Sequence, residues 1–222
     1  MRSVIVIGAT GMVGRQLVQA LIKDTRFDSV KVFARKPTGI SNAKLQENIV
    51  DFDKPDTWKK KVTGDVLYSA MGTTLRAAGS KEAQYKVDYT YQYQTAKIAA
   101  ANGVRTYVLI SAAGSSPDSK IFYSRTKGEL ERDVVKLPFD TIHIIRPGML
   151  AGDRKETRIG EQIGIGVMNV IGLIPGLSKL KPIQAKQVAC AMINATFRLA
   201  EGIHTYTMGE VFKLAHRNDI KP

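Results

Sequence analysis

The stretch VIGATGMVGRQL, residues 6–17, decides the fold class, because an apolar run leads into three glycines and then into a helical pattern. The spacing is GxxGxxG, one residue longer at its front than the GxGxxG fingerprint of dinucleotide-binding folds. Glycine permits a tight turn with outward-facing backbone N–H groups, and a helix N-terminus adds positive dipole for a pyrophosphate. The loop therefore predicts a dinucleotide site. The residues predicted to contact the nucleotide here are Gly8, Thr10, Gly11, Met12, Val13 and Gly14.

Beyond this loop, short apolar runs alternate with helical periodicity. Strand-like runs lie at residues 3–8, 29–34, 48–52, 65–70, 105–111 and 140–148, and helical patterns at 11–23, 81–102, 121–131 and 184–200. Continuous apolar strands between helices are typical of a parallel sheet covered on both faces. We therefore expect an α/β protein with a doubly wound Rossmann fold, forming a single NAD(P)-binding domain over residues 1–222.

The alternation stops after Arg146, and residues 149–222 are predicted to form a small appendage that contributes the substrate-side lid. The apolar stretch 163–177 is interrupted by glycines and is shorter than the ~20 apolar residues that cross a bilayer. We favour a lid over a surface that touches a partner or a membrane. Arg154 and Arg158 either hold an anionic substrate or are solvated.

The choice of cofactor is predicted by VKVFARKP, residues 30–37, where the second strand ends in Arg35 and Lys36. An NAD-binding fold usually has an acidic residue there to bind the ribose 2′-hydroxyl, whereas a guanidinium suits a 2′-phosphate. NADP(H) is therefore the expected cofactor. Asp51 and the Phe52 backbone are predicted to lie beside the adenine, and Ala70, Met71 and Gly72 to pass under the cofactor.

The catalytic prediction comes from IFYSRTKGELE, residues 121–131, where Tyr123 and Lys127 lie one turn apart on one helix face. Ser111 closes an earlier strand, so a hydroxyl, a phenol and an ammonium could converge on a nicotinamide. Tyr123 would exchange a proton with a carbonyl or alcohol while hydride moves, and Ser111 would polarise the oxygen. Lys127 would stabilise the phenolate and hold the nicotinamide ribose.

Composition limits the partners, the cellular location and the metal sites that can be expected of the protein. The net charge of +13 suits binding to nucleic acid, to an anionic membrane or to an anionic ligand. Because the basic residues are scattered, we expect a small-molecule substrate, for which an anionic one is an option, rather than specific nucleic-acid binding. Peripheral membrane contact is the less favoured alternative. The single cysteine, Cys190, and an N-terminus without a signal-peptide pattern predict a cytoplasmic protein. No metal-ligand spacing occurs, so no metal is expected.

These motifs, in this order, resemble the short-chain dehydrogenase/reductase superfamily, in its extended or atypical branch. The segments VDFDKPD, MGTT, KVDYTY, FYSRTKGELE and RPGMLAGDRKETRIGE look more closely like the Tat-interacting oxidoreductase family. The resemblance implies an NADP(H)-binding fold, catalysis by Ser111, Tyr123 and Lys127, and a loop over the nicotinamide that contains Arg146 and Pro147. It also allows a monomer or a homodimer. One departure is Asp88, where many superfamily members have an asparagine that assists a proton relay.

Three functions compete on this evidence. The favoured one is an NADP(H)-dependent oxidoreductase that acts on a small carbonyl or alcohol. A nucleotide-sugar epimerase or dehydratase uses the same fold, and a regulatory protein that senses NADP(H) without turnover belongs to another class. The intact set of Ser111, Tyr123 and Lys127 favours the enzyme.

Overall fold

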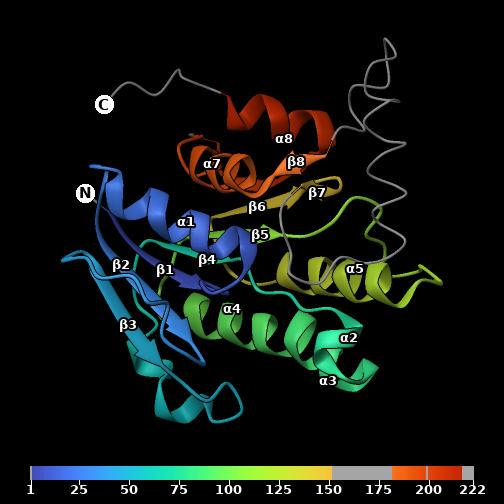
Figure 1. Cartoon of the computed structure of the whole chain (residues 1–222), viewed down its shortest axis with the longest axis horizontal. Coiled ribbons are helices and arrows are strands. Elements are labelled where there is room, and N and C mark those ends of the chain that lie inside the picture. The colour runs from blue at the N-terminus through green and yellow to red at the C-terminus, as the bar shows by residue number, and fades with distance from the viewer. Residues whose placement is uncertain (1, 152–181, 199, 217–222) are drawn as a thin grey trace.

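The computed structural model describes residues 2–151, 182–198 and 200–216 (Figure 1). The predicted lid stretch 163–177 and the residues Arg154 and Arg158 lie outside the described residues. The centre is a parallel sheet of seven strands in the order β3-β2-β1-β4-β5-β6-β9. Its strands are β1 (Arg2–Ile7), β2 (Phe27–Ala34), β3 (Leu45–Ile49), β4 (Val66–Ser69), β5 (Thr106–Ile110), β6 (Thr141–Arg146) and β9 (Gly202–Thr207).

The strand order confirms the predicted doubly wound α/β fold. The chain starts at β1 in the middle, builds outward through β2 to β3, and then returns to place β4 on the other side of β1. The direction of winding reverses between β1 and β4, and ligands of such sheets bind beyond the carboxyl ends of the strands at that point. The fold therefore puts the glycine loop, which follows β1, at the place where a ligand is expected.

Helices cover both faces of the sheet (Figure 1). One face packs against α1 (Met12–Lys23), α7 (Ala185–Ala195) and α8 (Met208–Ala215), and the other against α4 (Tyr91–Ala101) and α5 (Phe122–Val134). The short helices α2 (Leu75–Ala78) and α3 (Lys81–Tyr85) precede α4. The strands β1, β4 and β5 are buried on both faces, which explains why their sequences are continuously apolar.

Three predicted elements, one strand and two helices, differ from the structure. The third strand was predicted over 48–52 but spans Leu45–Ile49, because it is an exposed edge strand whose residues LQENI lack an apolar pattern. Phe52 lies after the strand and is buried, packing edge-on against Trp58 at 5.5 Å between ring centroids. The apolar signal that suggested a strand is therefore a packing contact of a loop.

The helix predicted over 81–102 is divided into α3, a π-helical segment at Lys86–Thr90, and α4. The helix predicted over 184–200 ends at Ala195, and β9 then joins the main sheet beside β6. Leu150 and Ala151 form the strand β7, which pairs with β8 (Ile183–Gln184). The described part of the segment 149–222 thus contributes both to the main sheet and, through β7 and β8, to a small second sheet.

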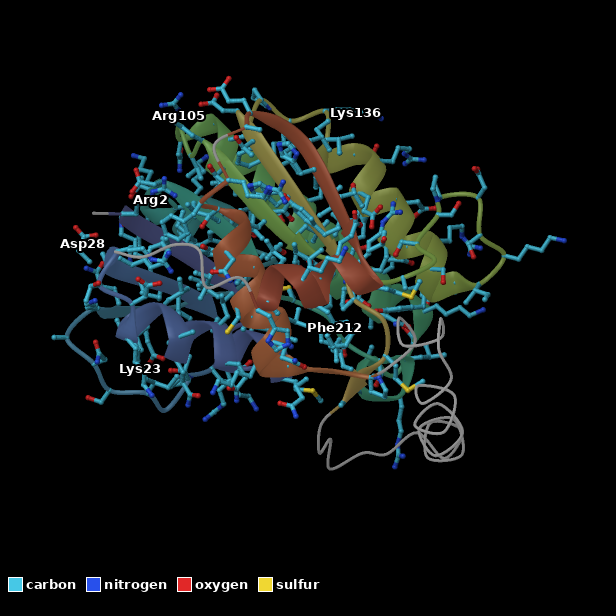
Figure 2. All side chains as sticks on the ribbon, turned by 90° about the horizontal axis from the view of Figure 1, so that it is seen from above. Arg2, Lys23, Asp28, Arg105, Lys136 and Phe212 are labelled. Carbon is cyan, nitrogen blue, oxygen red and sulfur yellow. The ribbon has the colours of Figure 1, made fainter. Side chains whose placement is uncertain are left out.

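Three of the described basic residues lie well apart from one another. Lys23 ends α1, Arg105 precedes β5 and Lys136 follows α5, and the three lie at separate points of the periphery (Figure 2). Among the described residues, no helix has the length and apolar character needed to cross a membrane.

Candidate active site

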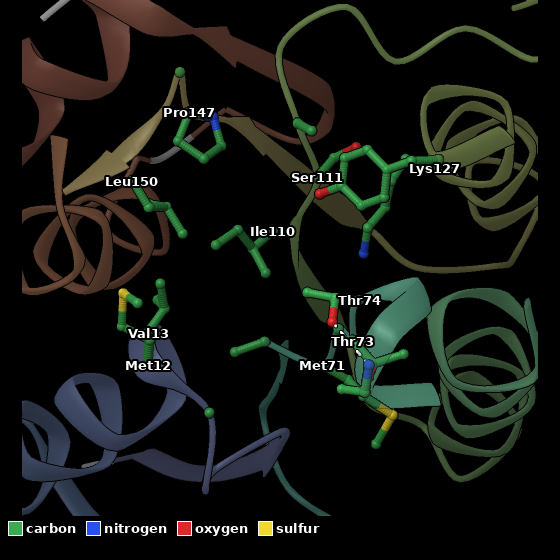
Figure 3. A pocket seen from close by; sticks show the side chains of 17 residues that line it. Met12, Val13, Met71, Thr73, Thr74, Ile110, Ser111, Lys127, Pro147 and Leu150 are labelled. Atoms are coloured by element: carbon green, nitrogen blue, oxygen red, sulfur yellow. Dashed lines mark hydrogen bonds between the residues drawn. The ribbon is translucent and has the colours of Figure 1, made fainter. Parts of the chain in front are cut away.

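A cavity of about 360 Å³ opens beyond the carboxyl ends of the central strands (Figure 3). Segments that are distant in sequence form its wall: the glycine loop and α1, the loop after β4 with α2, the end of β5, α5, and the turn after β6. The lining residues are Gly11, Met12, Val13, Ala70, Met71, Gly72, Thr73, Thr74, Ala77, Ile110, Ser111, Ala112, Tyr123, Lys127, Pro147, Gly148 and Leu150.

The glycine loop is compact enough that side chains would not fit at two of its positions. Gly8 has a φ of +81°, and a Cβ there would lie 2.4 Å from the backbone of Ala70 and Met71. A Cβ on Gly14 would lie 2.0 Å from the Gly8 carbonyl oxygen. Both glycines therefore serve close backbone packing, as the sequence predicts for a loop that brings α1 against the sheet.

The start of α1 fits an anionic group. Gly11 is the N-cap and supplies no side-chain acceptor, and the first turn carries no acidic residue. The unbonded N–H groups of a helix start, together with the helix dipole, attract phosphate. Gly11, Met12 and Val13 also line the cavity, so the residues present fit a pyrophosphate at this end.

The three predicted catalytic residues line the same cavity. Ser111 follows β5, is 5% exposed, and lies with its Oγ 3.1 Å from the Oγ of Ser115. Tyr123, in the first turn of α5, is 36% exposed, so its phenol is accessible. Lys127 is 3% exposed one turn later and reaches from α5 toward Thr73 and Thr74 (Figure 3). A hydroxyl, a phenol and an ammonium thus border the same cavity.

Lys127 has a buried anionic partner. Its Nζ lies 3.8 Å from Oδ1 of Asp88, whose carboxylate is completely buried. From the sequence, Asp88 was notable only because many members of the superfamily have an asparagine near this position. The structure places it in direct reach of a predicted catalytic residue.

The predicted adenosine-side residues lie outside the cavity lining. Arg35 and Lys36 are exposed directly after β2, and Asp51 and Thr10 are exposed as well. Asp51 accepts a hydrogen bond from the backbone N–H of Asp53 at 3.0 Å. These side chains are exposed and outside the cavity lining, so their contacts with a nucleotide stay predictions.

Arg146 is occupied by an internal ion pair. Its Nε donates to Oε1 of the buried Glu131 at 3.0 Å, and this bonding raises the pKa of the guanidinium above its ordinary value. The neighbouring Pro147 and Gly148 line the cavity, whereas Arg146 is absent from the lining residues. In the structure Arg146 therefore ties β6 to α5 and so holds the following turn in place.

Sequence reasoning missed Arg15, which follows Gly14 directly. Its Nη2 donates to the carbonyl of Thr38 at 3.0 Å, and the Thr38 N–H donates to Glu47 at 2.9 Å. Arg15 thereby connects the first turn of α1 with the loop that carries Arg35 and Lys36. A basic residue next to the third glycine was the available signal. Thr73, Thr74, Ala77, Ile110, Ala112 and Leu150 also line the cavity, and no role was predicted for them, although Thr73, Thr74 and Leu150 lie in segments that carry the family resemblance.

His143 is a core histidine rather than part of the site, as its apolar strand indicated. It is 1% exposed and its Nδ1 lies 3.3 Å from the Tyr206 hydroxyl. Burial, with smaller contributions from His204 and Arg198, lowers the pKa of His143 to about 4. The ring is therefore neutral at physiological pH. Among the described residues, no group of three or more His, Cys, Asp or Glu is arranged to hold a metal ion.

Residues 8–164 match the model of a family described as NAD(P)H-binding. The chain belongs to this family. Curated relatives are "Protein FMP52, mitochondrial" from Candida albicans, 36% identical over 200 residues with 86% of each chain covered, and "Protein FMP52-1, mitochondrial" from Scheffersomyces stipitis, 33% identical with 87% of each covered.

These relatives overturn the prediction of a cytoplasmic protein. The relatives from both yeasts, and those from Aspergillus niger and Aspergillus fumigatus, are named as mitochondrial. The prediction rested on one cysteine and on the missing signal-peptide pattern. Neither feature distinguishes the cytosol from other reducing compartments, so the inference went further than the chemistry allows.

Solved structures share the fold at low sequence identity. MoeE5 in complex with UDP-glucuronic acid and NAD has a TM-score of 0.67 at 16% identity, covering 93% of this chain and 76% of that one. A short-chain dehydrogenase/reductase superfamily protein from Agrobacterium tumefaciens with bound NAD has a TM-score of 0.67, also at 16% identity, covering 93% and 77%. At this identity the likeness establishes the Rossmann-like fold alone.

Proposed function

We propose that the protein is an NADP(H)-dependent oxidoreductase that moves hydride between the nicotinamide and a small carbonyl or alcohol, with Tyr123 as general acid and base. The observation that carries the proposal is that Ser111, Tyr123 and Lys127 line one cavity together with the N-terminus of α1. A dinucleotide bound across this cavity would bring its nicotinamide to the three polar side chains.

Each side chain has a distinct role in the proposed reduction. The bound nicotinamide supplies the hydride. Ser111 donates a hydrogen bond to the substrate carbonyl oxygen and so orients it. Tyr123 gives that oxygen its phenolic proton, and the ammonium of Lys127 stabilises the phenolate that remains. In the reverse direction Tyr123 takes the proton from the alcohol. The partial exposure of Tyr123 lets a substrate reach its hydroxyl.

The preference for NADP(H) rests on charge at the end of β2. Arg35 and Lys36 are exposed there, and Arg15 ties the same loop to α1 through Thr38. A 2′-phosphate adds negative charge that Arg can bind with two parallel hydrogen bonds. The family description covers both NAD and NADP, and the neighbours MoeE5 and the Agrobacterium protein were crystallised with NAD, so the preference is a proposal about this chain.

The proposal also covers the substrate, the oligomeric state and the location of the protein in the cell. The proposed substrate is a small molecule, and an anionic substrate is one option. The protein is proposed to act as a monomer or a homodimer and not to bind nucleic acid specifically. The resemblance to the Tat-interacting oxidoreductase family supports an NADP(H) enzyme. The names of the FMP52 relatives support a mitochondrial location.

The alternative enzyme is a nucleotide-sugar epimerase, because solved neighbours include UDP-glucuronic acid 4-epimerase from Bacillus cereus with a TM-score of 0.65 at 16% identity. The two functions differ in their use of cofactor. An epimerase returns the hydride to its substrate and consumes no NADPH, whereas a reductase oxidises NADPH in proportion to product. A protein that only senses NADP(H) would bind without turnover.

Calorimetric titration with NADPH and with NADH, repeated on Arg35→Asp, tests the cofactor proposal. We expect NADPH to bind at least about tenfold more tightly, as one charge-assisted contact provides, and the substitution to remove most of the difference. Lys97→Asp on α4 changes the charge equally without touching the end of β2 and should preserve the preference. Equal affinities for both nucleotides in the unaltered protein would contradict NADP(H) specificity. NADPH oxidation against a panel of small carbonyls then tests turnover.

A further inference from the structure

Asp88 is a completely buried carboxylate at an irregular point of the main chain. It lies in the π-helical segment Lys86–Thr90, which interrupts the helix expected over 81–102. Segments of π-helix are rare and occur frequently at functional sites. A buried carboxylate is costly unless it is paired and hydrogen-bonded, so its partners indicate what holds it there.

The carboxylate connects two walls of the cavity. Its Oδ1 accepts a hydrogen bond from the backbone N–H of Thr73 at 3.0 Å and lies 3.8 Å from the Lys127 ammonium. Its Oδ2 accepts from Nε2 of Gln84 at 3.3 Å. Thr73 belongs to the loop after β4 and Lys127 to α5, and both residues line the cavity.

Gly72 lies beside both members of this ion pair and, having no side chain, leaves room for them at the cavity wall. A Cβ on Gly72 would lie 3.3 Å from Oδ1 of Asp88 and 3.8 Å from Nζ of Lys127. Gly72 itself lines the cavity. The charges therefore lie directly against the wall, where a ligand would experience them in surroundings of low polarity.

The main chain of the π-helical segment is fastened to the same loop. Nε2 of Gln92 donates to the Asp88 carbonyl at 2.7 Å, and the Ser69 hydroxyl donates to Oε1 of Gln92 at 2.7 Å. Ser69 ends β4, so the loop that leads to Thr73 is held at both ends through Asp88. All of these side chains are buried.

We propose that Asp88 is a positioning residue that holds the Lys127 ammonium and the Gly72–Thr73 backbone in register for the nicotinamide half of a bound dinucleotide. The inference rests on the proposed function in one respect, namely that this cavity binds NAD(P)H. It differs from the relay role of the superfamily's asparagine, because a carboxylate only accepts hydrogen bonds and adds a negative charge. Asp88 thus acts through Lys127.

The test compares two probes on the full chain: NADPH, and 2′,5′-ADP, which lacks the nicotinamide half. Asp88→Asn keeps the shape and an acceptor for Thr73 but removes the charge. We expect it to weaken NADPH about tenfold, as loss of one charged contact does, and to leave 2′,5′-ADP affinity within about twofold. In the Lys127→Met background, Asp88→Asn should have no further effect on NADPH.

Asp133→Asn is the matched control. It removes another carboxylate with ionic partners, since Asp133 binds Arg132 at 2.7 Å and Lys136 at 3.0 Å, and it lies on α5 outside the cavity lining. It should leave the affinities of both probes unchanged.

Two results would overturn the proposal. Parallel weakening of NADPH and 2′,5′-ADP by Asp88→Asn would show general structural damage, and an unchanged NADPH affinity would show that Asp88 does not act on the nicotinamide half. If NADH replaces NADPH as the preferred ligand, NADH and ADP serve as the probes, so failure of the NADP(H) preference is distinguished from failure of this proposal. Thermal denaturation of each variant reports whether it is folded.

Discussion

The two ends of the cavity are built in different ways. At the nucleotide end, one continuous segment, Gly8–Gly14, presents backbone atoms and a helix start. At the end proposed to be catalytic, Ser111 lies directly after β5, Tyr123 and Lys127 lie on α5, and Asp88 lies beside Lys127 from a third element.

Both ends nevertheless use a glycine to bring a helix close to neighbouring backbone. A Cβ on Gly14 of α1 would lie 2.0 Å from the Gly8 carbonyl oxygen, and a Cβ on Gly128 of α5 would lie 2.1 Å from the Ser116 carbonyl carbon. The comparison predicts that a larger side chain at either glycine would destabilise the local packing. Removal of a side-chain functional group should impair only the end proposed to be catalytic.

The largest effect is expected for Tyr123→Phe, which removes the proton donor and leaves the ring. Turnover of a carbonyl substrate should fall about 1000-fold, within the range of general acid catalysis, while NADPH affinity stays within about threefold. Steady-state kinetics and calorimetry measure the two quantities. Tyr93→Phe, on α4 in the stack of Tyr85, Tyr89 and Tyr93, is the matched control and should leave turnover unchanged. Retained turnover in Tyr123→Phe would contradict the assignment.

The next effect is expected for Gly14→Ala, where a single methyl group meets backbone that cannot move aside. The free energy of unfolding should fall by about 3 kcal/mol, as for overpacking in a rigid core. Gly11→Ala is the comparison variant, because its Cβ would lie 3.3 Å from the Gly8 oxygen and needs only a small adjustment. Urea denaturation measures both variants. Equal losses would mean that the loop does not depend on close approach at Gly14.

His143 is a buried titratable group outside the cavity lining, so it shows how burial alone changes a pKa and the pH dependence of stability. Burial lowers the pKa of His143 to about 4 from 6.5, so the unfolded state takes up the proton first as pH falls. This contribution to stability is complete above pH 6.5, is lost between pH 6.5 and 4, and levels off below. The loss amounts to roughly 3 kcal/mol.

Chemical denaturation of the protein and of His143→Gln over this pH range measures that loss. The variant should lack the decline between pH 6.5 and 4, while His204→Gln, which alters the partly exposed neighbour, should retain most of it. Identical pH dependence in the protein and in His143→Gln would show that this ring is not the source of the decline. Asp24 cannot mimic the effect, because hydrogen bonds to Arg26, against the opposing effect of burial, lower its pKa from 3.8, so that its contribution is lost only at lower pH.

Local sequence was sufficient for the elements that are buried on both faces. The strands β1, β4 and β5 and the glycine loop were predictable because burial and tight turns restrict residue type at each position. Local sequence failed at β3, where an exposed edge strand places little restriction on side chains. It also failed at Lys86–Thr90, where the π-helical segment is hydrogen-bonded to Gln92, and Gln92 in turn to Ser69 of β4.

By itself the sequence determined the doubly wound fold, the dinucleotide loop and the pairing of Tyr123 with Lys127 on one helix face, because each follows from periodicity or spacing within one segment. Only the tertiary structure decided that Arg146 is held by Glu131, that Arg15 fastens the loop of Arg35, and that Asp88 lies against Lys127. These contacts join residues 15 to 39 positions apart, and such pairs meet only once the sheet has brought their elements together.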